Sequence, residues 1–315
     1  MQVHRRELIA SSAVVALASL TADGAPAPRV AKRFQKGQSP WPICLDTATI
    51  RPASLKDKVR IAAEAGYDAI EPWDRELLEF ESQGGDLQAL GREIKDRGLF
   101  VPSMIGLWNA IPATQEAWDR QLPETRNRMR AAAAIGAQHV QTIPQPARPW
   151  REFDPKWAAD RYRELLELGL REYQLNPAMV FVQFLEGSKR MGQAAQIAID
   201  ADHPKAKIIP DVFHMYIGDS GFNGLKHIRG DFIAIFQFND APTTPPKEQQ
   251  KDEHRVYPGD GILPLEQCLR DLITIGYQGA VSLELYNPSY WKQDPLEVAR
   301  TGLRKTLEVI RKAVP

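Results

Sequence analysis

From Trp41 to the end of the chain, short apolar segments alternate with longer segments of helical periodicity. The short segments are rich in β-branched and aromatic residues, whereas the longer ones carry apolar residues three or four positions apart. This alternation is typical of parallel strands that are joined by crossover helices. We therefore predict strands within residues 42–50, 69–73, 100–108, 139–144, 179–186, 207–214, 232–240 and 279–286.

The segments between these strands begin and end as helices do. Ser54 is a suitable N-cap before one helix, and Asp86 before another that we expect to end at Gly98. Similar patterns predict helices within residues 263–277 and 294–313. Eight strand and helix pairs in about 275 residues match the size of a closed barrel. The predicted fold is therefore α/β, a single (β/α)8 TIM barrel over residues 41–315. A doubly wound open sheet is the alternative, but no glycine-rich phosphate-binding motif follows the first predicted strand.

The first 40 residues differ in composition from the rest of the chain. The adjacent Arg5 and Arg6 precede an apolar stretch from Leu8 to Leu20, and small residues follow as far as Ala27. The apolar stretch is too short to span a bilayer, so this layout predicts an export signal peptide of the twin-arginine type over residues 1–27. Residues 28–40 are then a polar linker, and the mature protein would be periplasmic or extracellular, without stable insertion into a membrane. A surface helix that stays attached is the alternative interpretation.

The overall charge argues against a polyanionic partner. Forty basic residues balance forty acidic ones, so no net field favours nucleic acid or an anionic membrane surface. The two cysteines, Cys44 and Cys268, are too few and too far apart to indicate a disulfide framework or a thiolate metal site. We expect a small-molecule ligand, bound by the single chain or by a homo-oligomer.

Polar residues gather at the ends of the predicted strands, where TIM barrels place their active sites. Alternation along the last two strands points Gln237 and Glu284 toward the barrel axis. Carboxylates that converge in a dry barrel mouth would repel one another unless a cation lies among them. Each residue alone would more often be solvated or ion-paired, so it is their coincidence at successive strand ends that predicts a metal. The predicted ligands are Glu186, Asp211, Gln237 and Glu284, an oxygen-rich set that favours Mn²⁺, with Mg²⁺ or Co²⁺ as alternatives.

Several motifs resemble the xylose-isomerase-like superfamily of sugar isomerases and epimerases. They are the glutamate after the fifth strand, "DVFHM" at the sixth, "RVYPGDGILP" after the seventh and "GYQGAVSLELY" at the eighth. The superfamily includes ketose 3-epimerases, hydroxypyruvate isomerases, and inosose or dehydroshikimate dehydratases. The resemblance implies a TIM barrel, the same four metal ligands, and substrate contacts from His214 and Arg255.

Two positions depart from the pattern of the ketose 3-epimerases. Gln237 stands where they have a histidine, although hydroxypyruvate isomerases have glutamine at the matching place. Gly192 stands where they have a further carboxylate, six residues after the glutamate of strand five. These departures argue against a genuine ketose 3-epimerase.

The predicted function is a divalent-metal-dependent isomerase or epimerase. The metal would polarise a substrate carbonyl, and Glu186 and Glu284 would act as base and acid through a cis-enediolate. His214 and Arg255 would bind the substrate oxygens. Further candidate substrate contacts are Glu71, Trp73 and Trp108; the two tryptophans could form an apolar wall or could simply pack at the barrel rim.

Three other functions use the same fold. An exported keto-sugar or keto-glycoside lyase or dehydratase would share the first proton abstraction and then expel a leaving group. A non-catalytic sugar-binding barrel would keep the fold without turnover. A zinc-dependent DNA-repair endonuclease is disfavoured, because its metal cluster needs many more histidines than the six of this chain.

Overall fold

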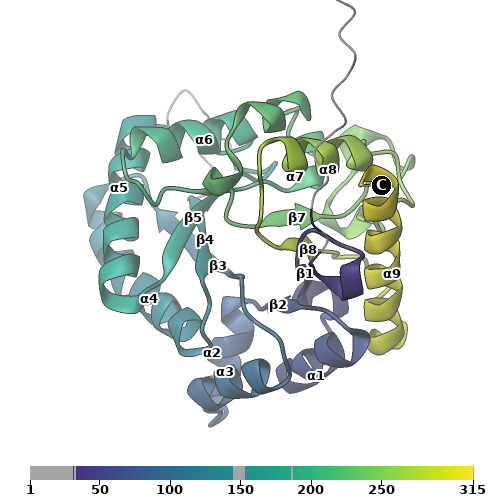
Figure 1. The fold of residues 1–315 in the computed structure, drawn as a ribbon. Coiled ribbons are helices and arrows are strands. Elements are labelled where there is room, and N and C mark those ends of the chain that lie inside the picture. Colours follow the sequence, from purple (N-terminus) through teal and green to yellow (C-terminus); the bar gives the residue numbers. More distant parts are fainter. Residues whose placement is uncertain (1–30, 32, 145–152, 186, 315) are drawn as a thin grey trace, which may run out of the picture.

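The computed structural model describes residue 31 and residues 33–144, 153–185 and 187–314. The predicted signal peptide, residues 1–27, lies outside the described residues, as does the start of the predicted linker. In the described part, parallel strands occupy the centre and helices surround them (Figure 1). The strands are β1 (Ile43–Asp46), β2 (Ala69–Glu71), β3 (Ser103–Ile111), β4 (His139–Pro144), β5 (Asn176–Val180), β6 (Ile208–Ile209), β7 (Phe236–Phe238) and β8 (Val281–Leu283). The α-helices are α1 (Leu55–Ala65), α2 (Asp74–Ser82), α3 (Leu87–Asp96), α4 (Gln115–Ala134), α5 (Pro155–Leu168), α6 (Met191–Asp200), α7 (Val212–Ile217), α8 (Leu265–Thr274) and α9 (Pro295–Ala313).

The strands close into a barrel at two seams. They form two parallel groups of four, in the orders β2-β1-β8-β7 and β3-β4-β5-β6. At the β2–β3 seam, the backbone N–H of Ile70 donates to the carbonyl of Phe100 at 3.0 Å. At the β6–β7 seam, Gln237 N–H donates to Pro210 O at 2.9 Å. The predicted (β/α)8 barrel is therefore confirmed.

Side chains alternate across the barrel wall as the sequence predicted for the last two strands. Ile235 and Ala280 belong to a cluster of small and branched residues inside the barrel. Phe236, Phe238 and Val281 belong instead to the larger core between the strands and the helices. Gln237 shares the inward parity of Ile235, which places its amide at the barrel mouth.

The predicted helix boundaries are also confirmed. The Ser54 hydroxyl accepts from Asp57 N–H, and the Asp86 carboxylate accepts from the N–H groups of Gln88 and Ala89. Capping of this kind satisfies donors that the first turn of a helix leaves unpaired. In the part of the chain that the structure describes, no helix combines the length and apolar character that a membrane span requires.

Strand five ends earlier than the sequence suggested. We predicted a strand over residues 179–186, but β5 ends at Val180 and a turn follows, in which Leu185 N–H donates to Val182 O at 2.8 Å. Ser188 N–H then donates to Leu185 O. Strand alternation therefore does not apply to Gln183, which the sequence pattern could not place. Glu186 lies outside the described residues.

The predicted strand over residues 207–214 is wrong in its second half. Only Ile208 and Ile209 are extended, and residues 212–217 form the short helix α7. Pro210 has no N–H for a strand ladder, and Asp211 caps the helix through hydrogen bonds from Phe213 N–H at 2.7 Å and His214 N–H at 3.0 Å. The motif "DVFHM" is thus a capped helix start at the barrel mouth.

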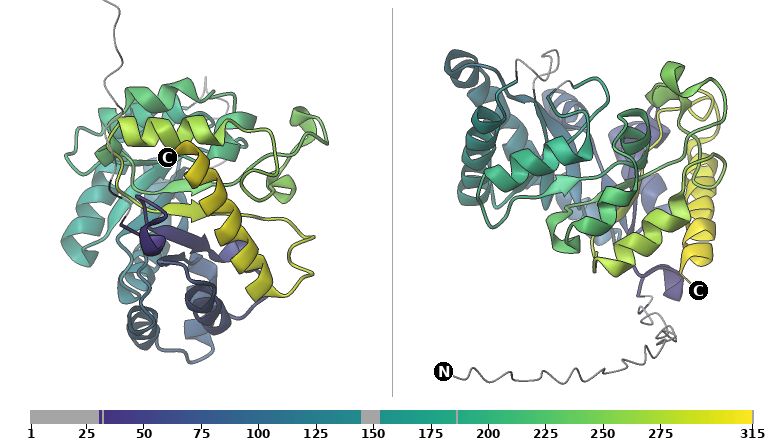
Figure 2. Two further views of the ribbon diagram at one scale, coloured as in Figure 1. Left: turned by 45° about the vertical axis from the view of Figure 1, so that its right-hand side comes forward. Right: turned by 90° about the horizontal axis from the view of Figure 1, so that it is seen from above.

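The segments that follow β7 and β8 extend from the same side of the barrel (Figure 2). The first carries Arg255 and the second carries Tyr286. Both segments follow the carboxyl ends of their strands, so they bring additional polar groups to the side where the predicted site lies.

Candidate active site

A cavity of about 110 Å³ opens at the carboxyl ends of the strands. Its polar lining consists of Gln141, His214, Gln237, Asp252, Arg255 and Glu284. Its aromatic lining consists of Trp73, Trp108, Phe181, Phe184 and Tyr286. Most of the predicted site residues therefore face one enclosed space.

The guanidinium of Arg255 lies at the centre of the polar side. Its Nη1 donates to Asp211 Oδ2 at 2.7 Å and to Glu284 Oε2 at 2.6 Å. Its Nη2 donates to Asp252 Oδ1 at 2.6 Å and lies 3.0 Å from His214 Nε2. Arg255, Asp211 and Glu284 are buried, whereas the Asp252 side chain is 30% exposed, so this single cation offsets the charge of carboxylates that are mostly shielded from water.

Helix α7 positions two of these groups. Because Asp211 Oδ1 is used for capping, Oδ2 remains to meet Arg255. His214 lies in the first turn of α7 and presents Nε2 to the same guanidinium. Its Nδ1 is buried without a hydrogen-bond partner among the described residues.

Glu284 is held from both sides. Its Oε1 accepts from Gln237 Nε2 at 3.1 Å and from the Tyr286 hydroxyl at 2.7 Å. Its Oε2 accepts from Arg255. Gln237, from β7, and Glu284, directly after β8, therefore meet at the barrel axis, as their strand parity predicted.

The two principal carboxyls differ in their electrostatics. Burial raises the pKa of Glu284 well above its ordinary range, despite the nearby guanidinium. Burial also acts to raise the pKa of Asp211, but Arg255 and His214 outweigh it and hold that pKa below its usual value. Burial lowers the pKa of His214. Glu284 is thus the member of the pair that protonates more readily.

Glu71 lies in the layer below the cavity and does not line it. Its Oε1 accepts from Gln141 Nε2 at 3.0 Å and its Oε2 accepts from the Ser282 hydroxyl at 2.8 Å. The side chain is completely buried. It supports Gln141 from beneath, and its predicted contact with substrate stays a prediction.

Aromatic rings form one wall of the cavity. Trp73 and Trp108 stack with their ring centroids 5.9 Å apart, and Trp73 meets Tyr286 edge-on at the same distance. Trp73 and Trp108 follow or belong to neighbouring strands β2 and β3, as expected. The wall adjoins the Arg255 cluster, because the Arg255 Cζ lies 5.0 Å from the Tyr286 ring centroid and the Tyr286 hydroxyl donates to Glu284.

The donor set matches a divalent cation in chemical type. The amide of Gln237 contacts Glu284, and Arg255 Nη1 joins Glu284 to Asp211, so two carboxylates and an amide lie around a positive charge. These are oxygen ligands of the kind that hard cations prefer. Among residues 33–144, 153–185 and 187–314, no three His, Cys, Asp or Glu side chains form a metal-binding group. The predicted fourth ligand, Glu186, lies outside these residues.

Sequence reasoning missed several groups at the site. Asp252 lies one turn before Arg255 in "DEHR" and holds two of its nitrogens. Tyr286 follows Glu284 by two residues, and Gln141 lies within β4. Asp46 is buried behind Trp73, with Oδ2 unpaired among the described residues. Alternation along the strands could have suggested Gln141, whereas no strand pattern marks Asp252.

A family comparison decides the classification. The sequence profile of the family described as Xylose isomerase-like TIM barrel matches residues 59–313. The chain belongs to this family. Among curated relatives, an inosose isomerase of Bacillus velezensis is 24% identical over 274 residues, which cover 86% of this chain and 97% of that protein. A 3-dehydroshikimate dehydratase of Pseudomonas aeruginosa is 25% identical over 262 residues, 81% of this chain and 39% of that protein.

Solved structures confirm the xylose-isomerase-like barrel. A crystal structure of the IolI protein with a bound zinc atom has a TM-score of 0.79 at 24% identity and covers 86% of this chain and 98% of that one. An L-ribulose 3-epimerase has a TM-score of 0.69 at 16% identity and covers 87% and 95% of the two chains. The curated relatives named above are an isomerase and a dehydratase, so this chain is similar to enzymes.

Proposed function

We propose that this chain is a divalent-metal-dependent isomerase or epimerase of a sugar or a related polyhydroxylated ketone. The observation that carries the proposal is the buried cluster around Arg255, which faces an aromatic-walled cavity at the mouth of a xylose-isomerase-like barrel. A buried cluster with this much charge is costly to maintain for stability alone. Its position at the carboxyl ends of the strands supports a catalytic use.

The metal would be held by Asp211, Gln237 and Glu284, with Glu186 as the fourth ligand. When bound, the ion would polarise a substrate carbonyl and make the neighbouring C–H more acidic. The oxygen-rich ligands favour Mn²⁺, with Mg²⁺ or Co²⁺ as alternatives. The zinc atom in the crystal structure of the IolI protein, which has the same fold, supports the binding of a divalent ion.

Different side chains would carry out the proton transfers and the binding of the substrate. Glu284 would take or return a proton on one face of the substrate and Glu186 on the other. His214, which lines the cavity, would face the substrate oxygens. The five N–H groups of Arg255 already point at Asp252, Asp211, Glu284 and His214, so Arg255 would hold these groups in position around the substrate. Trp73, Trp108 and Tyr286 would pack against the C–H face of the substrate and exclude water.

A lyase or dehydratase is the second candidate. The dehydratases among the relatives favour it. The departures at Gln237 and Gly192 argue against a ketose 3-epimerase but leave both an isomerase and a lyase open. The first proton abstraction would be the same, and a β-leaving group would then depart. If residues 1–27 act as an export signal, the substrate would be a free or oxidised sugar outside the cytoplasm rather than a phosphorylated intermediate.

The decisive experiment follows exchange of substrate protons with solvent. The purified protein, incubated with Mn²⁺ and a panel of keto-sugars and inososes in heavy water, should incorporate deuterium next to the carbonyl. Glu284→Gln should reduce the exchange rate about 1,000-fold, since general acid–base groups contribute factors of this order. The exposed carboxylate variant Glu266→Gln is the matched control and should retain the wild-type rate. Absence of exchange with every compound would favour a non-catalytic binding barrel.

A further inference from the structure

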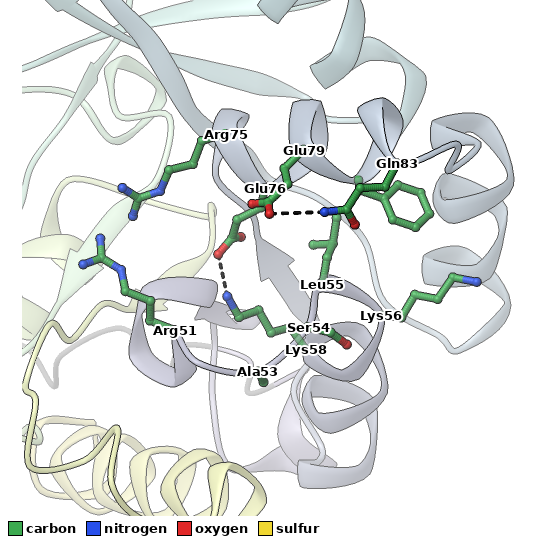
Figure 3. A pocket seen from close by; sticks show the side chains of 11 residues that line it. Arg51, Ala53, Ser54, Leu55, Lys56, Lys58, Arg75, Glu76, Glu79 and Gln83 are labelled. Carbon is green, nitrogen blue, oxygen red and sulfur yellow. Dashed lines mark hydrogen bonds and ion pairs between the residues drawn. The ribbon is translucent and has the colours of Figure 1, made fainter.

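Figure 3 shows a second cavity, of about 570 Å³. Two of its lining residues, Arg51 and Arg75, contact the ring of Trp73, which belongs to the aromatic wall of the active site. Residues that follow β1 form one side of the second cavity, and helix α2, which follows β2, forms the other. The cavity therefore also belongs to the carboxyl-end face of the barrel. Four basic residues line it, Arg51, Lys56, Lys58 and Arg75, together with two acidic ones, Glu76 and Glu79.

The acidic residues of this cavity already have partners. Glu76 Oε1 forms an ion pair with Lys58 Nζ at 2.5 Å, and its Oε2 accepts from the Thr47 hydroxyl at 2.7 Å. Glu79 accepts from Gln83 Nε2 at 3.3 Å. Figure 3 shows the contacts of Glu76 with Lys58 and of Glu79 with Gln83 in the middle and right of the cavity, away from the two arginine guanidinium groups.

Arg51 and Arg75 are left without a carboxylate partner among the described residues. Their guanidinium groups point toward one another from opposite sides of the cavity (Figure 3). The Arg51 Nε is buried and makes no hydrogen bond within the described chain. Burial, and next the positive charge of Arg75, lower the pKa of Arg51. The positive charges of Arg51 and Arg75 are therefore held near one another, and the Arg51 Nε–H donor is unused within the described chain.

Aromatic rings hold both guanidinium groups in place. The Arg51 Cζ lies 5.6, 5.7 and 5.0 Å from the ring centroids of Trp73, Tyr286 and Trp291, and the Arg75 Cζ lies 4.3 Å from that of Trp73. Stacking of this kind orients a guanidinium but leaves its N–H donors available. Trp73 and Tyr286 also line the active-site cavity, so the arginine pair adjoins the rings that the substrate would touch.

We propose that Arg51 and Arg75 bind an anionic group, a carboxylate or a phosphate, that the substrate of the neighbouring cavity carries. Each guanidinium group can donate two hydrogen bonds to a pair of oxygens of such a group. The negative charge of the ligand would also neutralise the positive charge of the two arginines. The inference rests on the proposed function and narrows it, because the substrate would be an acidic sugar derivative rather than a neutral polyol. In an exported protein, a sugar carboxylate fits better than a phosphate ester.

The test compares binding of matched charged and neutral probes. D-glucuronate, D-glucose 6-phosphate and D-glucose are titrated into the full chain, and binding is measured by calorimetry and by tryptophan fluorescence. We expect saturable binding of at least one anion below about 10 mM, with D-glucose at least tenfold weaker. Arg51→Gln and Arg75→Gln should each weaken anion binding about tenfold and leave D-glucose unchanged. About 0.5 M NaCl should also weaken it.

Lys56→Gln is the matched control, because it removes one positive charge from the same cavity but lies away from the arginine pair. It should retain anion binding within about twofold. Tighter binding of D-glucuronate would identify the anionic group of the ligand as a carboxylate. Tighter binding of D-glucose 6-phosphate would identify it as a phosphate. The proposal is overturned if no anion binds better than D-glucose, or if Lys56→Gln weakens binding as much as the arginine variants.

The same titration in Glu284→Gln separates this inference from the proposed function. Anion-selective binding should persist in this variant, which loses deuterium exchange, because Glu284 does not line the arginine cavity. If the wild type binds anions selectively but shows no deuterium exchange with any compound, the arginine site is supported and the catalytic proposal is overturned. Deuterium exchange with neutral ketones only, together with no selectivity for anions, would support the catalytic proposal and overturn the arginine site.

Discussion

At the scale of single residues, Arg255 decides the charge balance of the site. A guanidinium that is completely buried has lost its hydration, and ion pairs with its partners must offset this desolvation free energy. Asp211, Asp252 and Glu284 together do this at distances of 2.6 to 2.7 Å. The same carboxylates would repel one another without it. Arg255 and a bound divalent ion would therefore serve overlapping electrostatic purposes.

Replacement of Arg255 tests this overlap. Arg255→Gln should lower the free energy of unfolding by about 3–5 kcal/mol in metal-free buffer, because it leaves buried carboxylates unpaired. Mn²⁺ should recover part of the loss, since it restores positive charge between Asp211 and Glu284. Urea unfolding with and without Mn²⁺ measures both effects. Arg304→Gln, which removes an exposed pair with Glu308, is the control and should change stability by less than about 1 kcal/mol. The idea fails if Mn²⁺ stabilises Arg255→Gln no more than the wild type.

At the scale of elements, the segment after β7 is fixed by Asp240. Its Oδ2 accepts from the N–H groups of Gly259 and Gly261 at 3.0 Å, and its Oδ1 from those of Leu263 at 2.9 Å and Ala241 at 2.8 Å. Gly261 has no room for a side chain, because a Cβ would lie 2.2 Å from Ala241 O. The "PGDG" motif is therefore a carboxylate-bound turn that anchors the stretch carrying Arg255.

Loss of this anchor should weaken both the fold and the site. Asp240→Ala should cost about 2–4 kcal/mol of unfolding free energy, because it leaves several buried N–H groups unsatisfied, and Asp240→Asn should cost less. Deuterium exchange on a substrate should slow in both variants as Arg255 loses its position. Asp260→Asn, in the same turn but ion-paired with Lys305 at the surface, is the comparison. An equal loss of stability in Asp260→Asn would contradict the role of Asp240.

The sequence predicted long-range geometry best where strand alternation continues to the end of the strand. Gln237 and Glu284 meet at the axis, as their parity required. The prediction from sequence failed where the chain leaves the strand early. After β6, Pro210 ends the strand and Asp211 caps α7, and after β5 a turn replaces the predicted end of the strand. The contacts of Arg255 could not be predicted, since they join residues 29 and 44 positions apart. These contacts depend on where two loops lie in the folded protein rather than on a local sequence pattern.

At the scale of the whole molecule, the polar cluster lies at one of the two places where the barrel closes. Only two bridges join β6 to β7, from Ile208 to Ile233 and from Asp211 to Gln237. Arg255 then links Asp211, after β6, to Glu284, after β8. The β2–β3 seam is bridged at Ala69 and at Trp73. Within the described part of the chain, the hydrogen bonds and ion pairs of Arg255 go to Asp211, His214, Asp252 and Glu284 and not to this seam. The active-site cluster therefore reinforces one seam of the barrel and not the other.

This asymmetry predicts a local change in hydrogen exchange. In Arg255→Gln, the amide of Gln237, which donates to Pro210 O across the β6–β7 seam, should exchange about ten- to a hundredfold faster, because the cluster that holds the seam closed is lost. The amide of Ile105, which donates to Pro72 O across the β2–β3 seam, should change much less. Hydrogen exchange measured by NMR on the wild type and the variant, under conditions where both are folded, compares the two amides directly. An equal acceleration at both seams would mean that Arg255 stabilises the whole barrel, and no acceleration at Gln237 would mean that backbone pairing alone closes it.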